Sequence, residues 1–480
     1  MRPGKRVVFD RFELDPERRH LTAAGEPVAI SERQFAVLLA LVGRAGQIVA
    51  KEDLLQAGWQ DVAVGDNSVE QVISTLRRLL GPSPGGGSYI VTVPRRGYRF
   101  GAEVSFRASR QSDAALDALL SPYRAFIEGR AAIEAFRADQ VAPARAAFED
   151  AVGRLPEHAS AHVGLANACI MQFEMTRVAP EPSGDALRLA VEHAREACRL
   201  DPQWAEAWAT LGFVLRRTGD RLDASAALKR AVALEPDNWQ HHVRLASVSW
   251  GEERLRAARR SLTLLQDFPL ARWLAATVYV ARQGFDQAER ELTSALASLA
   301  SPESVPRFGA VAIHWLRGLV WLARGETTRA QGEFDLELAL EDRGHVYARE
   351  CCANTWYAIG ASCLRQHRRD DARAAFGQAL LRVPTHPLAR IGAVAAGTPP
   401  RDDEKPAAVY TDSAQGALVE AVRLAVAGEL ERAARVMEIG LATAPAGEGA
   451  WFLPVEPLLY VTARADVWAR PLALIRERAA

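Results

Sequence analysis

One spacing of bulky and small residues recurs along the alanine- and leucine-rich part of the chain. Two copies carry it in full with identical offsets: Trp208, Leu211, Gly212, Ala224, Leu228, Ala231 and Pro236, and then Trp356, Ile359, Gly360, Ala372, Phe376, Ala379 and Pro384. Small residues at fixed positions let two helices approach closely, and the bulky positions fill the space between them. Because one such helix pair cannot bury its apolar face alone, the pattern predicts a stacked array of pairs.

This spacing resembles the tetratricopeptide repeat, a 34-residue pair of helices. Pro202 and Pro236 lie one such period apart. Weaker copies are marked by Ala144, Phe148, Ala151 and Pro156; Leu165, Ala166, Ala190 and Pro202; Ala275, Ala276, Tyr279, Ala288, Leu292 and Ala295; Gly318, Trp321, Ala330 and Phe334; Ala433, Met437, Gly440 and Pro445; and a shortened unit over about 241–269. We therefore expect an all-α superhelix of about eight units over residues 122–480. Loops or sub-array boundaries are expected at 174–184, 301–307 and 397–411.

Arrays of this family present a concave surface to their partners. By the resemblance, the residues that line it are Glu206, Phe213, Arg216, Arg217, Asn354, Tyr357 and Arg365. Among them, Arg216, Arg217, Tyr357 and Arg365 are our candidates for contacting a protein, a peptide or another ligand. The alternative for the arginines is an ordinary solvated charge. The Lys/Asn clamp of chaperone-binding repeats is absent from these positions, so we do not predict that activity.

Residues 1–107 have a different pattern, with β-branched alternation, turns and short helical segments. We expect strands at 7–9, 12–14 and 28–30, helices over 32–42, 51–59 and 68–80, and a final hairpin of 89–93 and 98–100. Ser31 and Gln34 form a capping box at the start of the first helix. Residues 108–121 have the composition of a linker.

Strands, three helices and a hairpin, in this order, resemble the OmpR/PhoB-type winged-helix DNA-binding domain, as found in CadC-, ToxR- and HilA-like regulators. The residues that carry the resemblance are Leu14-Asp15, Gly25, the helix from Glu32 to Leu41, Lys51 to Leu54, Trp59, Asp66 to Val69, Leu76 to Gly81 and Tyr89 to Phe100. The fold class expected for the whole chain is thus an α+β winged helix followed by an all-α superhelix. One departure is Ala50, where the family often has a capping serine.

The third helix, 68–80, has two distinct faces at 100° per residue. The apolar face carries Val69, Val72, Ile73, Leu76 and Leu80. By resemblance the polar face enters the major groove, and the wing at 94–97 enters the minor groove of double-stranded DNA. The candidate DNA-binding residues are Asn67, Ser68, Gln71, Ser74, Thr75, Arg77, Arg78, Arg95, Arg96 and Arg99. The alternative for Arg77 is an ion pair with an acidic group of the domain, and Tyr98 is expected to pack the hairpin onto the helix.

Charge is divided between the two parts of the chain. The chain has 59 basic and 59 acidic side chains, but residues 1–107 hold 15 and 12 of them, which leaves −3 on the remainder. Five arginines and one acid lie between residues 67 and 100. This mildly basic segment is compatible with nucleic-acid binding, whereas the total alone says nothing about it.

Catalysis is not expected, because phosphate-binding loops, zinc spacings and nucleophile elbows are missing from the sequence. We predict no metal and no cofactor. The five cysteines are expected to be buried small apolar residues. The sequence has no apolar run of membrane-spanning length and no signal-peptide pattern, so we expect a cytoplasmic protein.

We therefore predict a one-component transcriptional regulator, whose winged helix binds promoter DNA and whose array senses or recruits a partner. Neither a receiver domain nor a membrane segment is visible, which resembles the HilA-like layout. The resemblance also implies contact with RNA polymerase through loop 59–66 and a homodimer or tandem binding. The alternatives are an interaction scaffold with a vestigial winged helix and a small-molecule-sensing array that controls DNA affinity.

Overall fold

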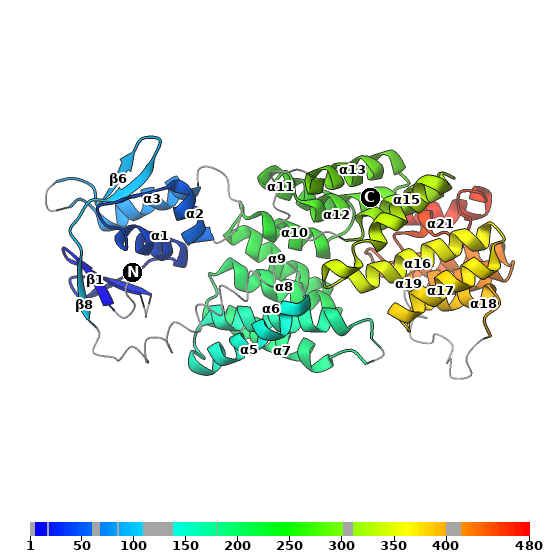
Figure 1. The fold of residues 1–480 in the computed structure, drawn as a ribbon, viewed down its shortest axis with the longest axis horizontal. Helices are drawn as coiled ribbons and strands as arrows, with labels where there is room; N and C mark the ends of the chain where they lie inside the picture. Colours follow the sequence, from blue (N-terminus) through cyan, green and yellow to red (C-terminus); the bar gives the residue numbers. More distant parts are fainter. Residues whose placement is uncertain are drawn as a thin grey trace. The chain divides into compact units, whose positions relative to one another are not determined.

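The chain divides into two compact units, Met1–Ala125 and Phe126–Ala480 (Figure 1). The computed structural model describes residues 5–16, 19–59, 68–83, 86–108, 138–179, 181–300, 311–399 and 414–480. Of the linker predicted at 108–121, only Ala108 lies among these residues, at the end of a strand.

A five-stranded antiparallel sheet forms one side of the N-terminal unit. Its order is β4-β3-β2-β1-β8, with β1 at Lys5–Phe9, β2 at Phe12–Asp15, β3 at His20–Ala23, β4 at Glu26–Val28 and β8 at Ser105–Ala108. Val7 is paired with Leu14 on one side and with Phe106 on the other. The strands predicted at 7–9 and 12–14 are confirmed, but the one predicted at 28–30 ends at Val28. Strands β3 and β8 were not predicted from the sequence.

Helices α1 at Glu32–Val42, α2 at Lys51–Trp59 and α3 at Ser68–Leu80 follow the first strands. The capping box of α1 is confirmed, because Ser31 Oγ accepts from the Gln34 amide and Gln34 Oε1 accepts from the Ser31 amide at 3.0 Å. The apolar face of α3 is also confirmed. Val69, Ile73, Leu76 and Leu80 are buried, and Val72 is half-buried.

The last hairpin joins a three-stranded sheet of order β5-β7-β6, made of β5 at Ile48–Val49, β6 at Ile90–Val93 and β7 at Gly97–Phe100. Gly97 has a φ of +120°, and a Cβ there would lie 2.1 Å from the carbonyl oxygen of Val49. Only glycine fits this contact between the hairpin and β5. The predicted hairpin is thus confirmed, whereas strand β5 was not predicted.

The second unit is built of antiparallel helix pairs, as the repeat pattern predicts. Its described helices are α5 (Ala138–Arg154), α6 (Ala159–Thr176), α7 (Gly184–Leu200), α8 (Ala205–Thr218), α9 (Arg221–Leu234), α10 (Trp239–Val248), α11 (Gly251–Leu264), α12 (Pro269–Ala281), α13 (Phe285–Ala300), α14 (Ile313–Ala323), α15 (Thr327–Leu338), α16 (Ala348–Arg365), α17 (Arg369–Arg382), α18 (Pro387–Ala395), α19 (Ala414–Val426), α20 (Leu430–Thr443) and α21 (Ala465–Arg478). Short 3₁₀ helices occur at Glu341–Arg343 (η1) and Leu453–Val455 (η3). None of the described helices has the length and apolar character to cross a bilayer.

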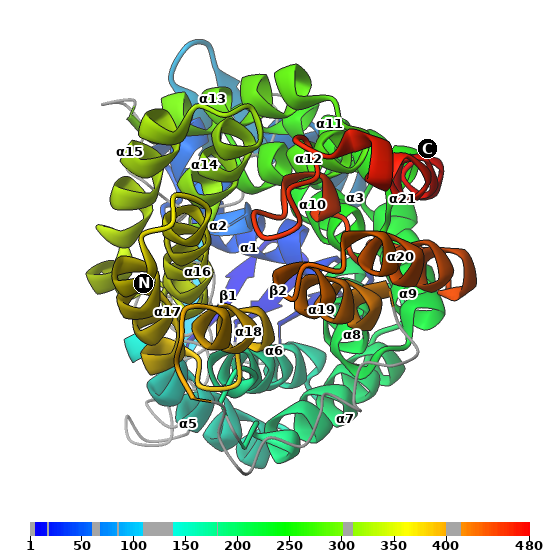
Figure 2. The ribbon, with the colours of Figure 1, turned by 90° about the vertical axis from the view of Figure 1, so that its right-hand side faces the viewer.

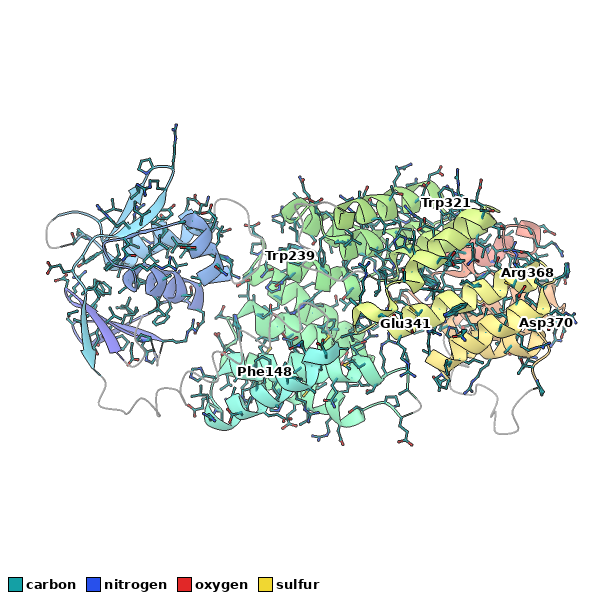
Figure 3. All side chains as sticks on the ribbon, viewed as in Figure 1. Phe148, Trp239, Trp321, Glu341, Arg368 and Asp370 are labelled. Carbon is teal, nitrogen blue, oxygen red and sulfur yellow. The ribbon has the colours of Figure 1, made fainter. Side chains whose placement is uncertain are left out.

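Close approach within each pair depends on the small residues of the repeat. A Cβ on Gly212 would lie 2.5 Å from the Leu228 side chain, and one on Gly360 would lie 2.7 Å from the Phe376 ring. Phe148 of α5 fills the equivalent place and is fully buried (Figure 3). The five cysteines are buried too, which confirms their predicted packing role.

The predicted interruptions of the array are partly corrected by the structure. Helix α6 continues through Glu174 to Thr176, so the first loop begins at Arg177 rather than at residue 174. Glu174 belongs to the helix because its side chain is held inside the array by two arginines. The break predicted at 301–307 lies outside the described residues, and so does most of the one at 397–411.

The first helices of successive pairs form the inner wall of the array, and the second helices lie outside them (Figure 2). Residues after α20 then pack against helices far back in the sequence. The η3 turn contacts α12 and α14. Arg282, the residue directly after α12, donates to the Ala479 carbonyl at 2.8 Å. Gln283 donates to the Leu472 carbonyl at 3.1 Å. These contacts connect the last helix to the middle of the array.

Candidate functional site

The polar face of α3 is turned to solvent in the N-terminal unit. Gln71, Ser74 and Arg78 are exposed, whereas Ser68 and Thr75 are half-buried. The Thr75 hydroxyl donates to the Gln71 carbonyl at 3.0 Å, a bond within the helix that leaves its lone pairs accessible. Because the opposite face is buried in the domain, this face is free to contact a ligand along its length.

The tip of the wing, residues 94–97, carries two neighbouring arginines on a tight turn. Arg95 adopts a left-handed backbone with φ of +62°, and the amide of Arg96 donates to the Val93 carbonyl at 3.0 Å. Both side chains are exposed, as is Arg99 on β7. Within the described residues, no carboxylate lies within ion-pair distance of Arg78, Arg95, Arg96 or Arg99. These guanidiniums are therefore available to an anion outside the domain.

Arg77 has a different environment from the other candidate residues. Its Nε donates to the Ile90 carbonyl at 3.0 Å, and a terminal nitrogen donates to Thr92 Oγ1 at 2.7 Å. These bonds join α3 to strand β6. Arg77 thus forms hydrogen bonds with the hairpin in place of the ion pair with an acidic group that was the alternative for this residue. A second tie joins α2 to α3 through the Lys51–Glu70 ion pair at 2.8 Å. The helix and the wing are thus held as one surface.

Two further predictions concern residues near this surface. Tyr98 is 7% exposed, as expected for a side chain that packs the hairpin onto the domain. Asn67 and most of the loop at 59–66 lie outside the described residues, and only Trp59, which is buried, is described.

In the array, three of the four candidate partner-binding residues line one cavity. Arg216 and Arg217 of α8 and Tyr357 of α16 face it together with Phe213 and Asn354, which were predicted for the same surface. Arg365 does not line it, because its guanidinium lies 5.0 Å from the ring centre of Tyr460. Glu206 instead pairs with Arg244 at 2.9 Å.

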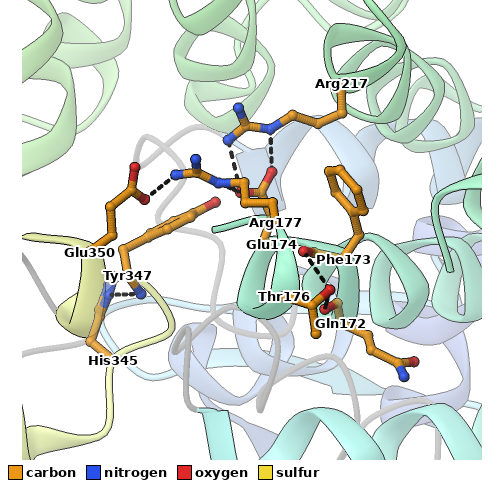
Figure 4. Close-up of polar contacts among 9 residues, drawn as sticks. All are labelled: Gln172, Phe173, Glu174, Thr176, Arg177, Arg217, His345, Tyr347 and Glu350. Atoms are coloured by element: carbon orange, nitrogen blue, oxygen red, sulfur yellow. Dashed lines mark hydrogen bonds and ion pairs between the residues drawn. The ribbon is translucent and has the colours of Figure 1, made fainter. Parts of the chain in front are cut away.

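An ion-pair cluster beside this cavity was not foreseen (Figure 4). The buried Glu174 carboxylate accepts from Arg177 at 2.8 Å and from both Arg217 Nε and a terminal nitrogen of Arg217. Arg177 also pairs with Glu350, and its guanidinium lies 5.8 Å from the ring centre of Tyr347. The paired residues Arg177 and Glu350 are 173 positions apart in the sequence. No local pattern could have found the cluster, since it depends on the curvature of the array.

Comparison with known proteins agrees with both units. Residues 25–100 match the family model described as "Transcriptional regulatory protein, C terminal", and residues 130–203 and 209–269 match the model of the tetratricopeptide repeat. The chain therefore carries an OmpR/PhoB-type winged-helix DNA-binding domain joined to a tetratricopeptide-repeat array.

Several relatives resemble the N-terminal part of the chain. The transcriptional regulatory protein CutR of Streptomyces coelicolor is 40% identical over 89 residues, which cover 18% of this chain and 39% of CutR. The transcriptional regulator HilA of Salmonella typhimurium is 37% identical over 101 residues, which cover 21% of this chain and 18% of HilA. The solved DNA-binding domain of RstA from Klebsiella pneumoniae, in complex with the RstA box, is 34% identical over 20% of this chain and 96% of that one, with a TM-score of 0.18. The chain thus spans well under half the length of the curated relatives CutR and HilA.

Proposed function

We propose that this protein is a transcriptional regulator that binds double-stranded promoter DNA. The observation that carries the proposal is the combination, in one domain, of an exposed polar helix face and an exposed pair of arginines on a wing. In this arrangement α3 lies in the major groove and the wing tip reaches the minor groove, where the negative potential is strongest. The matched regulator domain and the mildly basic charge of residues 1–107 support the same assignment.

Each side chain has a proposed role that follows from its position. Arg78 is suited to bidentate bonds with guanine, and Gln71 to bonds with adenine, because both are exposed on the groove-facing side of α3. Ser68, Ser74 and Thr75 contact base edges or phosphates. Asn67, which precedes Ser68 in the sequence, is proposed as a further DNA contact. Arg95 and Arg96 enter the minor groove, and Arg99 contacts phosphate. Arg77 holds the wing against α3 and so positions the other residues.

Replacement of Arg78 by alanine tests the assignment of α3. We expect it to relax the preference at one base pair and to cost about 1–3 kcal/mol on the preferred sequence. Selection of random duplexes by the full chain, followed by affinity measurements on the preferred and the singly changed site, gives both numbers. Arg99→Ala is the matched control, since loss of a phosphate contact weakens all sequences alike. Unchanged preference in Arg78→Ala would contradict the proposed role of Arg78 as a base reader.

The array is proposed to recruit a protein or peptide partner, with Arg216, Arg217, Tyr357 and Arg365 as contact residues. Contact with RNA polymerase through loop 59–66 and a homodimer are proposed on the resemblance of the domain alone. The cavity favours the second candidate function, a small-molecule-sensing array that controls DNA affinity. No observation favours a scaffold with a vestigial winged helix, because the basic wing tip is intact and exposed.

A further inference from the structure

The inner wall of the array encloses a cavity of about 740 Å³. Side chains reach it from the first helices of the pairs, α6, α8, α10, α12, α14 and α16, and from the segment around η3. Pockets for small molecules typically have volumes of about 300–1,000 Å³. The cavity is therefore of the size of a single small-molecule site, and it belongs wholly to the second unit.

Three of the four arginines that line the cavity have carboxylate partners. Arg177 and Arg217 share the buried Glu174, with Glu350 as a second partner of Arg177 (Figure 4). Arg244 pairs with Glu206. The carboxylates neutralise the arginines with which they pair, so the three arginines add little net charge to the wall.

Arg216 is the exception among them. Among the described residues it has no hydrogen-bond or ion-pair partner, although it lines the cavity. The carboxylates that favour its charged form are Glu448 and Glu174. Both are engaged elsewhere, since Glu448 pairs with Arg254 and Arg221 and Glu174 pairs with Arg177 and Arg217.

The guanidinium of Arg216 remains charged in this setting. Burial and the neighbouring Arg217 lower the pKa of Arg216 to about 10, which is still well above neutral pH. Arg216 is half-buried, so its charge has lost part of its hydration without gaining a partner. An anion that binds there recovers part of that cost. The site therefore has a physical preference for a negatively charged group.

Glu456 also lines the cavity, but it does not supply that charge. The residue is 2% exposed, and Tyr357 donates a hydrogen bond to one of its carboxylate oxygens. Burial raises the pKa of Glu456 to about 7, so much of it is neutral at neutral pH. Its other oxygen is buried without a hydrogen-bond partner among the described residues.

Aromatic side chains form much of the remaining wall: Phe213, Trp239, Phe268, Trp273, Trp315 and Trp451. The rings of Trp239 and Phe268 lie 4.5 Å apart, and those of Trp273 and Trp451 lie 6.2 Å apart edge to face. Such walls bind planar apolar groups by stacking and by burial of apolar surface.

We propose that the cavity binds a small organic anion, a carboxylate or phosphate carried on an aromatic body, with the anionic group on Arg216 and the body between the aromatic side chains. The proposal goes beyond DNA binding and does not depend on it, because the site lies within the array. If the chain did not bind DNA, the proposed anion site would be unaffected. If the array did not bind an anion, the proposal of DNA binding would be unaffected.

The test uses three probes with the same naphthalene body: 1-naphthoate, 1-naphthyl phosphate and the neutral 1-naphthol. Calorimetric titration of the full chain without DNA gives stoichiometry and affinity. We expect one site per chain and at least one anion that binds about tenfold more tightly than naphthol, the gain typical of a charge-assisted hydrogen bond. Tighter binding of naphthoate would indicate a carboxylate ligand, and tighter binding of naphthyl phosphate would indicate a phosphate ligand.

Arg216→Met keeps an unbranched apolar stem and removes the charge of the side chain. We expect this variant to bind both anions no more tightly than naphthol, with naphthol binding unchanged. Arg216→Lys should retain part of the preference, and it serves as the decisive variant if the methionine variant does not fold. Arg188→Met, at an exposed arginine on the outer helix α7, is the matched control and should behave as the wild type.

Two results would overturn the proposal. One is that neither anion binds the wild-type chain more tightly than naphthol. The other is that the preference for an anion survives unchanged in Arg216→Met, which would place the anion on another residue.

Discussion

Replacing Arg95 and Arg96 together by alanine will lower the affinity of the full chain for DNA of most sequences and reduce its dependence on salt. Each arginine that the wing brings into the phosphate-lined minor groove releases counterions on binding, and so contributes about one unit to the slope of log K against log salt concentration. With both contacts gone, the slope should become shallower by about two. The fold should not change, since both side chains are exposed at the tip of the wing.

The measurement is a titration of one duplex by the full chain at several salt concentrations. Arg188→Ala with Arg199→Ala is the matched control, because these arginines are also exposed but lie on α7 beside acidic partners. The control should keep the wild-type slope. An unchanged slope in the wing variant would mean that the wing does not contact DNA.

Replacing Glu448 by alanine will destabilise the array strongly. Arg254 is 1% exposed, and it donates to the Ala246 and Ser249 carbonyls, to Thr277 and to Glu448. Without Glu448 its buried charge has no counter-ion, and such losses cost about 3–5 kcal/mol. We expect about 3 kcal/mol, the lower end of that range, because the Glu448 side chain is 30% exposed and water reaches it.

The destabilisation can be followed as a shift of the array's unfolding transition in urea by far-UV circular dichroism, since the array holds most of the helices. Glu431→Ala is the control at an exposed ion pair with Arg464, where less than about 1 kcal/mol is expected. The double variant Glu448→Ala with Arg254→Met should recover most of the loss, because it removes the buried charge as well. Equal stability of Glu448→Ala and Glu431→Ala would contradict the account of this pair.

Much of the fold follows from local sequence, and the exceptions have a common cause. The helix pairs and the face of α3 are set by small and apolar residues at fixed spacings, which a single sequence displays. Strands β3, β5 and β8 were missed because each is short and is defined by its partners. Strand β8 pairs with β1 about one hundred residues earlier, and it begins just before the segment that was read as a linker.

The candidate sites were predictable to different degrees. Exposure of Gln71, Arg78, Arg95 and Arg96 follows from helical phase and from the position of a turn, both of them local properties. The bonds of Arg77 to strand β6 do not, since they depend on how α3 meets the hairpin. Arg216 was placed on the inner surface by the repeat, but the sequence could not show that its neighbours pair with one another.

The most direct test of the central claim is binding of the full chain to a set of genomic DNA fragments across a salt series. A promoter-binding regulator should select particular fragments, with an affinity that falls steeply as salt increases and exceeds that for the other fragments at every concentration. Weak binding of equal strength to all fragments, with no selected sequence, would contradict the assignment of this winged helix as a DNA reader.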